Sequence, residues 1–123
     1  MTNTVLSWLR GYPGLENLRP EALDMYPGST GLFCKGLTLL RRNTDILGRE
    51  FRRQRLDFLL LRHCTGDSGA QWLLDFTPWA HSTAPVLGQD GVFSCGKGRL
   101  IRADDQGVSR YELQLTFEFT QEV

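Results

Sequence analysis

The chain has 123 residues, of which 41% are hydrophobic and 23% are charged, and its 14 basic and 14 acidic residues balance to a formal net charge of zero. These values are ordinary for a globular protein and exclude a low-complexity or highly charged chain, so we expect one domain over residues 1–123 with its own core. The longest uninterrupted apolar run is Phe58–Leu61, which is far too short to cross a bilayer, and we expect no membrane contact.

The charges are unevenly distributed along the chain. Residues 1–63 contain ten basic and six acidic residues, and residues 64–123 contain four and eight, so the two halves have formal charges of +4 and −4. Twelve of the basic residues are arginines, which suit planar, bidentate contacts with carboxylates and phosphates better than lysines do. This division is a hint of opposed electrostatic faces.

The first 28 residues predict a short helix and a short strand. The helix covers the apolar positions of 5–9, and either Thr2 or Asn3 could cap it. It should end at the glycine that precedes Tyr12. The strand covers 22–26 and is closed by a Pro-Gly pair.

The middle of the chain predicts extended structure. Residues 32–35 and 37–42 form two extended pieces. Residues 49–65 contain no glycine or proline and are first arginine-rich and then apolar, which indicates a long strand with one polar end. Its apolar end should be buried on both faces at the centre of a sheet, although the pattern leaves a helix open as an alternative.

A central helix is predicted over residues 70–81, where large apolar side chains recur at helical spacing. Asp67 or Ser68 could cap its start. Pro78 cannot donate to an earlier carbonyl, so it should kink the helix or lie close to its end.

The C-terminal third predicts three strands. After a loop over 82–91, the chain resumes as a strand over 92–95. Residues 97–103 and 108–120 then form an antiparallel hairpin, because 104–107 is a natural tight connection.

The last of these strands alternates apolar and polar residues without interruption from Tyr111 to Thr120. A strand gathers every second side chain on one face, so its apolar face needs a covering layer, which the central helix could supply. We therefore predict an α+β fold, a mostly antiparallel β-sheet covered by a central α-helix plus a short N-terminal helix. The candidate core consists of Trp8, Phe58, Leu60, Trp72, Phe76, Trp79, Tyr111, Leu113, Leu115, Phe117 and Phe119.

His63 and Asp67 have a spacing similar to the acyl-transfer motif of chloramphenicol-type acetyltransferases, in which a histidine acts as general base. The residue before His63 is Arg62, not a second histidine, and the chain is too short for that enzyme fold. Cys64 cannot pair with His63 as a nucleophile, because adjacent strand residues point to opposite faces. We favour His63 at a strand end and Asp67 as a helix cap, and expect no catalytic residue and no enzyme activity.

Metal and cofactor sites are also not predicted. Cys34, Cys64 and Cys95 are odd in number and far apart, and should be reduced and buried. The two histidines and the scattered acids have no metal-ligand spacing. The segment Gly96-Lys97-Gly98 lacks the rest of a phosphate-binding loop and fits a bend or bulge before a strand. We expect no metal and no cofactor.

The most basic segment spans residues 41–55. Its members are Arg41, Arg42, Arg49, Arg52, Arg53 and Arg55. A DNA contact would use these side chains, but Asp45, Glu50 and Asp57 interleave with them and aromatic residues are few. A solvated strand end or a subunit interface with Arg–carboxylate pairs is therefore favoured over nucleic-acid binding. A small-molecule pocket beneath the central helix is a third alternative, for which the sequence places no polar groups.

The order of these features resembles the small structural proteins of long-tailed bacteriophages and prophages, specifically the minor capsid or tail terminator (tail-completion) proteins of the head-tail junction. The resemblance covers nearly the whole chain. The resembling pieces are Leu9–Leu15, Pro27-Gly28, the basic strand leading into Phe58–Leu61, the helix with Phe76 and Trp79, and the closing run Arg110–Phe119.

The resemblance implies a virion protein without catalysis, made in the bacterial host cytoplasm. Such proteins form a homo-oligomeric ring, typically a hexamer, on the tail tube and present the surface that joins the head. The implied partners are further copies of the chain and the tail tube and head-completion proteins, with DNA only passing through the ring lumen. A head-to-tail ring needs two different complementary patches, which opposed charges could supply. The polar face of the final strand suits a wet channel wall or plain solvent.

Overall fold

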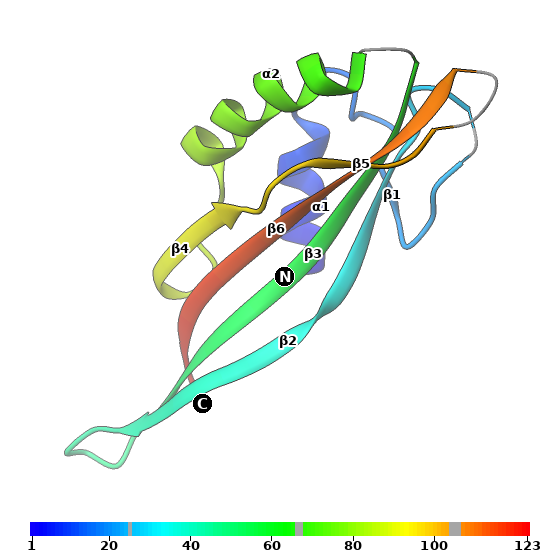
Figure 1. Ribbon diagram of the computed structural model, residues 1–123. Coiled ribbons are helices and arrows are strands. Elements are labelled where there is room, and N and C mark those ends of the chain that lie inside the picture. Colours follow the sequence, from blue (N-terminus) through cyan, green and yellow to red (C-terminus); the bar gives the residue numbers. More distant parts are fainter. Residues whose placement is uncertain (25, 66–67, 104–106) are drawn as a thin grey trace.

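Two helices cover one face of a six-stranded sheet in the computed structural model, which describes residues 1–24, 26–65, 68–103 and 107–123 (Figure 1). The elements in chain order are α1 (Thr2–Arg10), β1 (Arg19–Pro20), β2 (Thr30–Thr44), β3 (Glu50–Thr65), α2 (Ser68–Thr83), β4 (Gln89–Cys95), β5 (Arg99–Ala103) and β6 (Val108–Glu122). The strand order is β1-β2-β3-β6-β4, and β5 pairs with β6 beyond the end of β4. The fold is therefore α+β, as predicted.

Strands β3 and β6 form the antiparallel centre of the sheet. Their register places Phe58 opposite Leu115 and Leu60 opposite Leu113, and all four side chains are almost fully buried on the face that the helices cover. Along β6 the odd-numbered positions from 113 to 119 are buried and the even-numbered ones are half-buried. The alternation read from the sequence is thus confirmed, because a period of two on a one-sided sheet puts all apolar groups against the covering layer.

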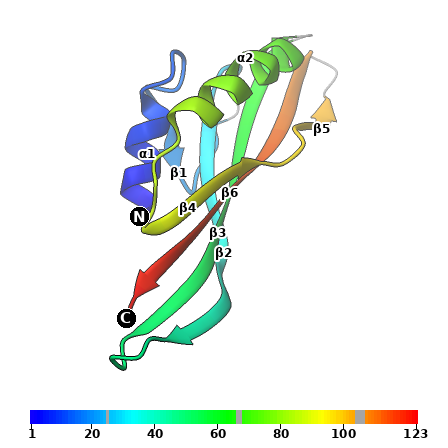
Figure 2. The same ribbon diagram turned by 90° about the vertical axis from the view of Figure 1, so that its left-hand side faces the viewer.

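Aromatic rings join the helices to each other and to the sheet. Trp8 of α1 stacks on Trp79 of α2, with centroids 5.5 Å apart and planes 4° apart. Trp8 also meets the edge of Phe117 in β6 at 6.0 Å. Phe76 is fully buried and touches both Tyr12 and Trp79. Both helices lie on the same side of the sheet and over the same half of its length (Figure 2).

Most of the candidate core residues lie in this layer. Phe58, Leu60, Phe76, Leu113, Leu115, Phe117 and Phe119 are buried, Trp8, Trp72 and Trp79 are partly buried against them, and Tyr111 is half-buried. The core has further members outside the candidate list, which are Val5, Leu6, Leu9, Leu15, Leu18, Leu32, Leu56, Ala80 and Leu87. Two of these, Leu15 and Leu18, belong to the irregular segment between α1 and β1.

The N-terminal third differs from the prediction in two places. The helix begins at Thr2 itself and has no side-chain cap, so neither Thr2 nor Asn3 acts as a cap. The strand expected over 22–26 is wrong: the short strand is β1, which pairs in parallel with Gly31 and Leu32 of β2. This pairing depends on a neighbour that comes later in the chain, so local preference could not locate it.

The two extended pieces over 32–35 and 37–42 are parts of one strand. Register shifts between Cys34 and Gly36 and between Leu39 and Arg41 insert extra residues into β2 without breaking its pairing with β3. The sequence pattern was interrupted at these bulges because each extra residue inverts the side-chain alternation.

The long strand and the central helix are confirmed with small changes. At the apolar end of β3, Leu59 and Leu61 are half-buried on the uncovered face, so the expectation of burial on both faces is wrong. Helix α2 passes through Pro78 and ends at Thr83, five residues later. The proposed cap Asp67 and the predicted connection at 104–106 lie outside the described residues.

The described helices lack the combination of length and apolar composition that crossing a membrane requires.

The β2–β3 hairpin extends past the part of the sheet that the helices cover (Figures 1 and 2). We call residues 35–55 the arm and the rest of the chain the body.

Candidate interaction surface

The arm exposes a set of large aliphatic side chains. These are Leu37, Leu39, Leu40, Ile46 and Leu47, and Ile46 at the tip is fully exposed. Leu37 and Leu39 lie opposite Leu56 and Gln54 in the β2–β3 register, on the face that the helices cover further along the sheet. They are exposed because the helical layer ends before it reaches them. A set of exposed apolar side chains on a projecting element is a candidate interaction surface.

The tip of the arm is a closed turn held by one aspartate. Asp45 Oδ1 accepts the backbone N–H groups of Leu47 and Arg49, both at 2.9 Å, and Asp45 Oδ2 accepts Arg49 Nε at 2.7 Å. Gly48 follows with a φ of +81°, which favours glycine. The hydrogen bond from the Arg49 amide, with the Arg49 side chain and the Leu47 amide, lowers the pKa of Asp45. The turn therefore presents Ile46 and Leu47 on a loop that the hydrogen bonds of the Leu47 and Arg49 amides hold closed.

The six arginines singled out from the sequence all lie on the arm, but their surroundings differ. Arg53 donates to the Asp90 carbonyl at 2.7 Å and lies 3.5 Å from Glu118, so it ties the arm to the body. Arg55 pairs with Asp57 at 3.1 Å.

The remaining arginines lie further out along the arm. Arg42 and Arg52 each lie 3.5 Å from the single carboxylate of Glu50, and Arg49 pairs with Asp45 at the tip. Arg41 has no carboxylate within ion-pair distance in the described ranges.

Positive charge is concentrated on the arm, although Glu118 and Glu122 of β6 lie beside it, opposite Arg55 and Phe51 in the β3–β6 register. Residues 35–55 contain seven basic and two acidic residues, which gives the arm a formal charge of +5. Residues 1–34 and 56–123 contain seven basic and twelve acidic residues, which gives the body a charge of −5. The comparison of the two sequence halves did not show this difference in charge, because the single strand β3 contains residues of both the arm and the body.

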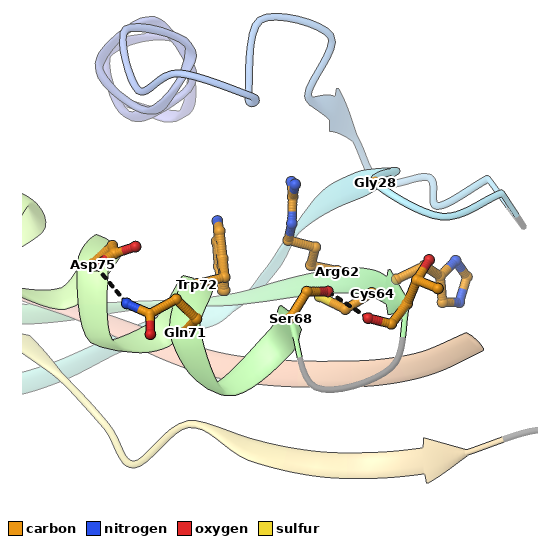
Figure 3. Close-up of a pocket in the computed structure, with 9 residues that line it drawn as sticks. Gly28, Arg62, Cys64, Ser68, Gln71, Trp72 and Asp75 are labelled. Atoms are coloured by element: carbon orange, nitrogen blue, oxygen red, sulfur yellow. Dashed lines mark hydrogen bonds between the residues drawn. The ribbon is translucent and has the colours of Figure 1, made fainter. Parts of the chain in front are cut away.

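A recess lies at the end of the sheet away from the arm, between β3 and the start of α2 (Figure 3). It has a volume of about 350 Å³. Arg62 lies over the Trp72 ring at 5.3 Å, and Gln71 donates to Asp75 at 3.0 Å across its rim. Ser68 donates to the Thr65 carbonyl at 2.7 Å. Most of its polar groups are thus already engaged with each other.

The recess does not assemble a catalytic dyad from its histidine and cysteine. His63 Nδ1 lies 2.7 Å from the Asp24 carbonyl and 3.1 Å from Ser29 Oγ, and Arg110 Nε donates to Nε2 at 3.3 Å, so both ring nitrogens are occupied. Burial raises the pKa of the Cys64 thiol, which keeps it protonated and poorly nucleophilic. His63 therefore fastens the segment around Asp24 and Ser29 to the end of β3.

The second hollow of interest is apolar. It is a groove of about 570 Å³ between α2 and the segment that leads into β5. The groove is lined by Ala70, Leu73, Leu74, Thr77, Pro78 and Gly98. A Cβ at residue 98 would lie 2.6 Å from Leu73 Cδ2, so glycine allows this segment to pack directly on the helix. Leu74 is 69% exposed, and Leu100 and Ile101 of the neighbouring strand β5 are also exposed.

The remaining sequence candidates are placed as follows. Cys34 is exposed, so the expectation that all three cysteines are buried is wrong for it, whereas Cys64 is buried and Cys95 is half-buried. In the Gly96-Lys97-Gly98 segment the Gly96 amide donates to the Gln114 carbonyl at 2.7 Å, which continues the pairing with β6. The described part of the chain contains no group of three or more acidic, histidine or cysteine side chains that could hold a metal ion.

Neither a protein-family model nor a curated protein matches this sequence. The arginine cluster identified in the sequence lies on the arm. The sequence did not predict the exposed leucines of the arm or the groove on α2, because a leucine on an uncovered strand gives the same sequence pattern as a leucine in the core. The two candidate interaction surfaces among the described residues are therefore the arm and the groove, which lie at opposite ends of the sheet.

Proposed function

We propose that this chain is a non-catalytic structural subunit of a phage or prophage virion, of the tail terminator or head-tail junction minor capsid type. Its copies assemble into a ring on the tail tube and offer the surface that joins the head. The resemblance in the order of sequence features motivates this assignment. The observation that supports it best is the arm, a projecting hairpin with exposed leucines and a charge of +5 on a body of −5.

A ring subunit needs two unlike surfaces, one that enters its neighbour and one that receives. The arm is suited to the first role because it projects past the helices and is both apolar and cationic. A body of opposite charge is suited to the second role. An enzyme, by contrast, would need a pocket with convergent reactive groups, and the described recess between β3 and α2 has its histidine and cysteine already occupied or protonated.

The cationic arm also favours a second candidate, a phage accessory protein that contacts DNA. Arg41 has no described carboxylate partner and the arm has an excess of five positive charges, as a phosphate-binding surface requires. The leucines of the arm argue against it, because a phosphate backbone offers nothing for Leu37, Leu39 and Leu40 to pack on.

The test is the mass of the protein in solution, measured by light scattering for the protein alone and for its mixture with a phage tail-tube protein. We expect a closed oligomer in at least one of these states. A strict monomer in both states would overturn the proposal. Binding to duplex DNA that weakens steeply as salt rises, without self-association, would favour the DNA-contacting alternative instead.

A further inference from the structure

We infer that the ring contact is made by the tip of the arm, which seats Ile46 and Leu47 in the apolar groove on α2 of a second copy of this chain. This inference rests on the proposed function and names the two surfaces that build the ring. The groove elements α2 and β5 lie at one end of the sheet and the arm tip lies at the other in both views (Figures 1 and 2).

The tip has the properties of an interface anchor. Ile46 is fully exposed and Leu47 is 75% exposed, although both are large aliphatic residues. Their backbone is fixed by the hydrogen bonds to Asp45, and the charges of Asp45 and Arg49 neutralise each other at 2.7 Å. A rigid apolar anchor loses little conformational entropy on docking, which is the property that makes a few residues dominate binding.

The groove has the matching properties of a receiving site. None of its six lining residues is charged, whereas the recess beside Arg62 and Asp75 is lined by both signs. Its volume of about 570 Å³ leaves room for two aliphatic side chains. Leu74 stands at its rim and would be covered by the incoming tip.

The occupant has to come from another molecule. The arm leads away from its own α2, so it cannot fold back into the groove (Figure 1). Two arms would repel each other, because the excess of five positive charges in residues 35–55 is only partly offset by Glu118 and Glu122 beside them. Two bulges also interrupt the free edge of β2 along which the arms could pair. The arm and the body of different copies, at +5 and −5, attract each other. The contact is therefore heterologous, which propagates around a ring.

A mixing experiment tests the contact. The tip variant carries Ile46→Asp with Leu47→Asp, and the groove variant carries Leu74→Glu. Each substitution is at an exposed position, so folding should be preserved, which circular dichroism verifies. Val86→Glu is the matched control, because Val86 is as exposed as Leu74 at 69% and lies outside the groove.

We expect each variant alone to be monomeric and the control to assemble like the unmodified chain. The equimolar mixture should form a one-to-one complex that grows no further, because the groove variant still has an intact arm and the tip variant an intact groove. An isologous tip-to-tip contact would instead leave the groove variant self-associated when it is alone, which would overturn the inference. Assembly of both variants to the full ring would show that the tip and groove are not the contact.

A cross-linking experiment covers the case of weak association. Ile46→Cys and Leu74→Cys are made separately in a Cys34→Ser background, mixed, and treated with a short bismaleimide, with Val86→Cys replacing Leu74→Cys as control. We expect a product joining positions 46 and 74 and little of the control product. A ring without the 46–74 product overturns this contact and leaves the proposed function standing. A monomer that gives no product at any concentration, both alone and with the tail-tube protein, overturns both.

Discussion

On the uncovered face of the sheet, the single residue Asp57 binds several neighbouring side chains. Its carboxylate accepts Thr116 Oγ1 at 2.8 Å, Arg55 Nε at 3.1 Å and Gln114 Nε2 at 3.3 Å. The side chain of Asp57 is only 14% exposed. The polar residues of β6 were expected to face a channel wall or plain solvent, yet two of them point to a shared acceptor on β3. This face is therefore partly self-satisfied rather than freely hydrated.

Replacing Asp57 should destabilise the chain. The change Asp57→Ala leaves three donors without their acceptor, and the expected loss is about 1–3 kcal/mol of unfolding free energy. The shift of the urea midpoint at constant slope measures it. Asp75→Ala is the control, because Asp75 is exposed and accepts only from Gln71 in the described structure, so it should change stability by less than about 0.5 kcal/mol. Equal effects of the two changes would contradict the role given to Asp57.

The three cysteines should differ in reactivity. Burial raises the pKa of the Cys95 thiol to about 11 and also raises that of Cys64, so both stay protonated at about pH 8. Cys34 is exposed and accessible. Alkylation of the folded protein followed by mass spectrometry should therefore label Cys34 first, and all three thiols only after unfolding in urea. Labelling of Cys64 or Cys95 as fast as Cys34 would show that their strands open readily.

At the scale of elements, the sequence correctly predicted the strands and helices whose apolar residues recur with a regular period. Strand β6 and helix α2 were found because strict alternation and helical spacing each require one apolar face, and both have one. The short strand was misplaced because β1 exists only through its pairing with Gly31 and Leu32. For the site, the arginines of the arm could be read directly. The exposure of Leu37 and Leu39 could not, because it depends on where the helical layer stops.

The tip turn should loosen at acidic pH. Its hydrogen bonds lower the pKa of Asp45, so the charged carboxylate is favoured in the folded turn. A lowered pKa in the folded state means that this stabilisation is present above the ordinary pKa of an aspartate and is lost as the pH falls through the lowered value. NMR titration should give an Asp45 midpoint below the ordinary range, with faster exchange of the Leu47 and Arg49 amides under acidic conditions. Asp45→Ala should show that fast exchange at neutral pH. A midpoint at the ordinary value would contradict the closed turn.

For the whole molecule, the separation of charge between arm and body matters more than the net charge of zero. A chain with an excess of positive charge on a projecting hairpin and of negative charge on the remainder is a dipole that would orient one copy toward the next. Apolar contact between tip and groove would then fix the distance and angle. The electrostatic attraction acts at a longer range than the apolar contact, so the contributions of the two can be distinguished by changing the salt concentration.

Assembly should slow as salt rises, because the long-range attraction between arm and body is screened within about 10 Å at 0.1 M ionic strength. We expect the initial rate of assembly, followed by light scattering, to fall on the order of tenfold between dilute and molar salt. Arg41→Glu with Arg42→Glu should cause a similar fall in dilute salt, since Arg41 has no described carboxylate partner and Arg42 only a 3.5 Å contact. Arg41→Lys with Arg42→Lys keeps the charge and should leave the rate near that of the unmodified chain. A rate that is the same at every salt concentration would mean that the charge separation has no part in assembly and that the apolar contact between tip and groove acts alone.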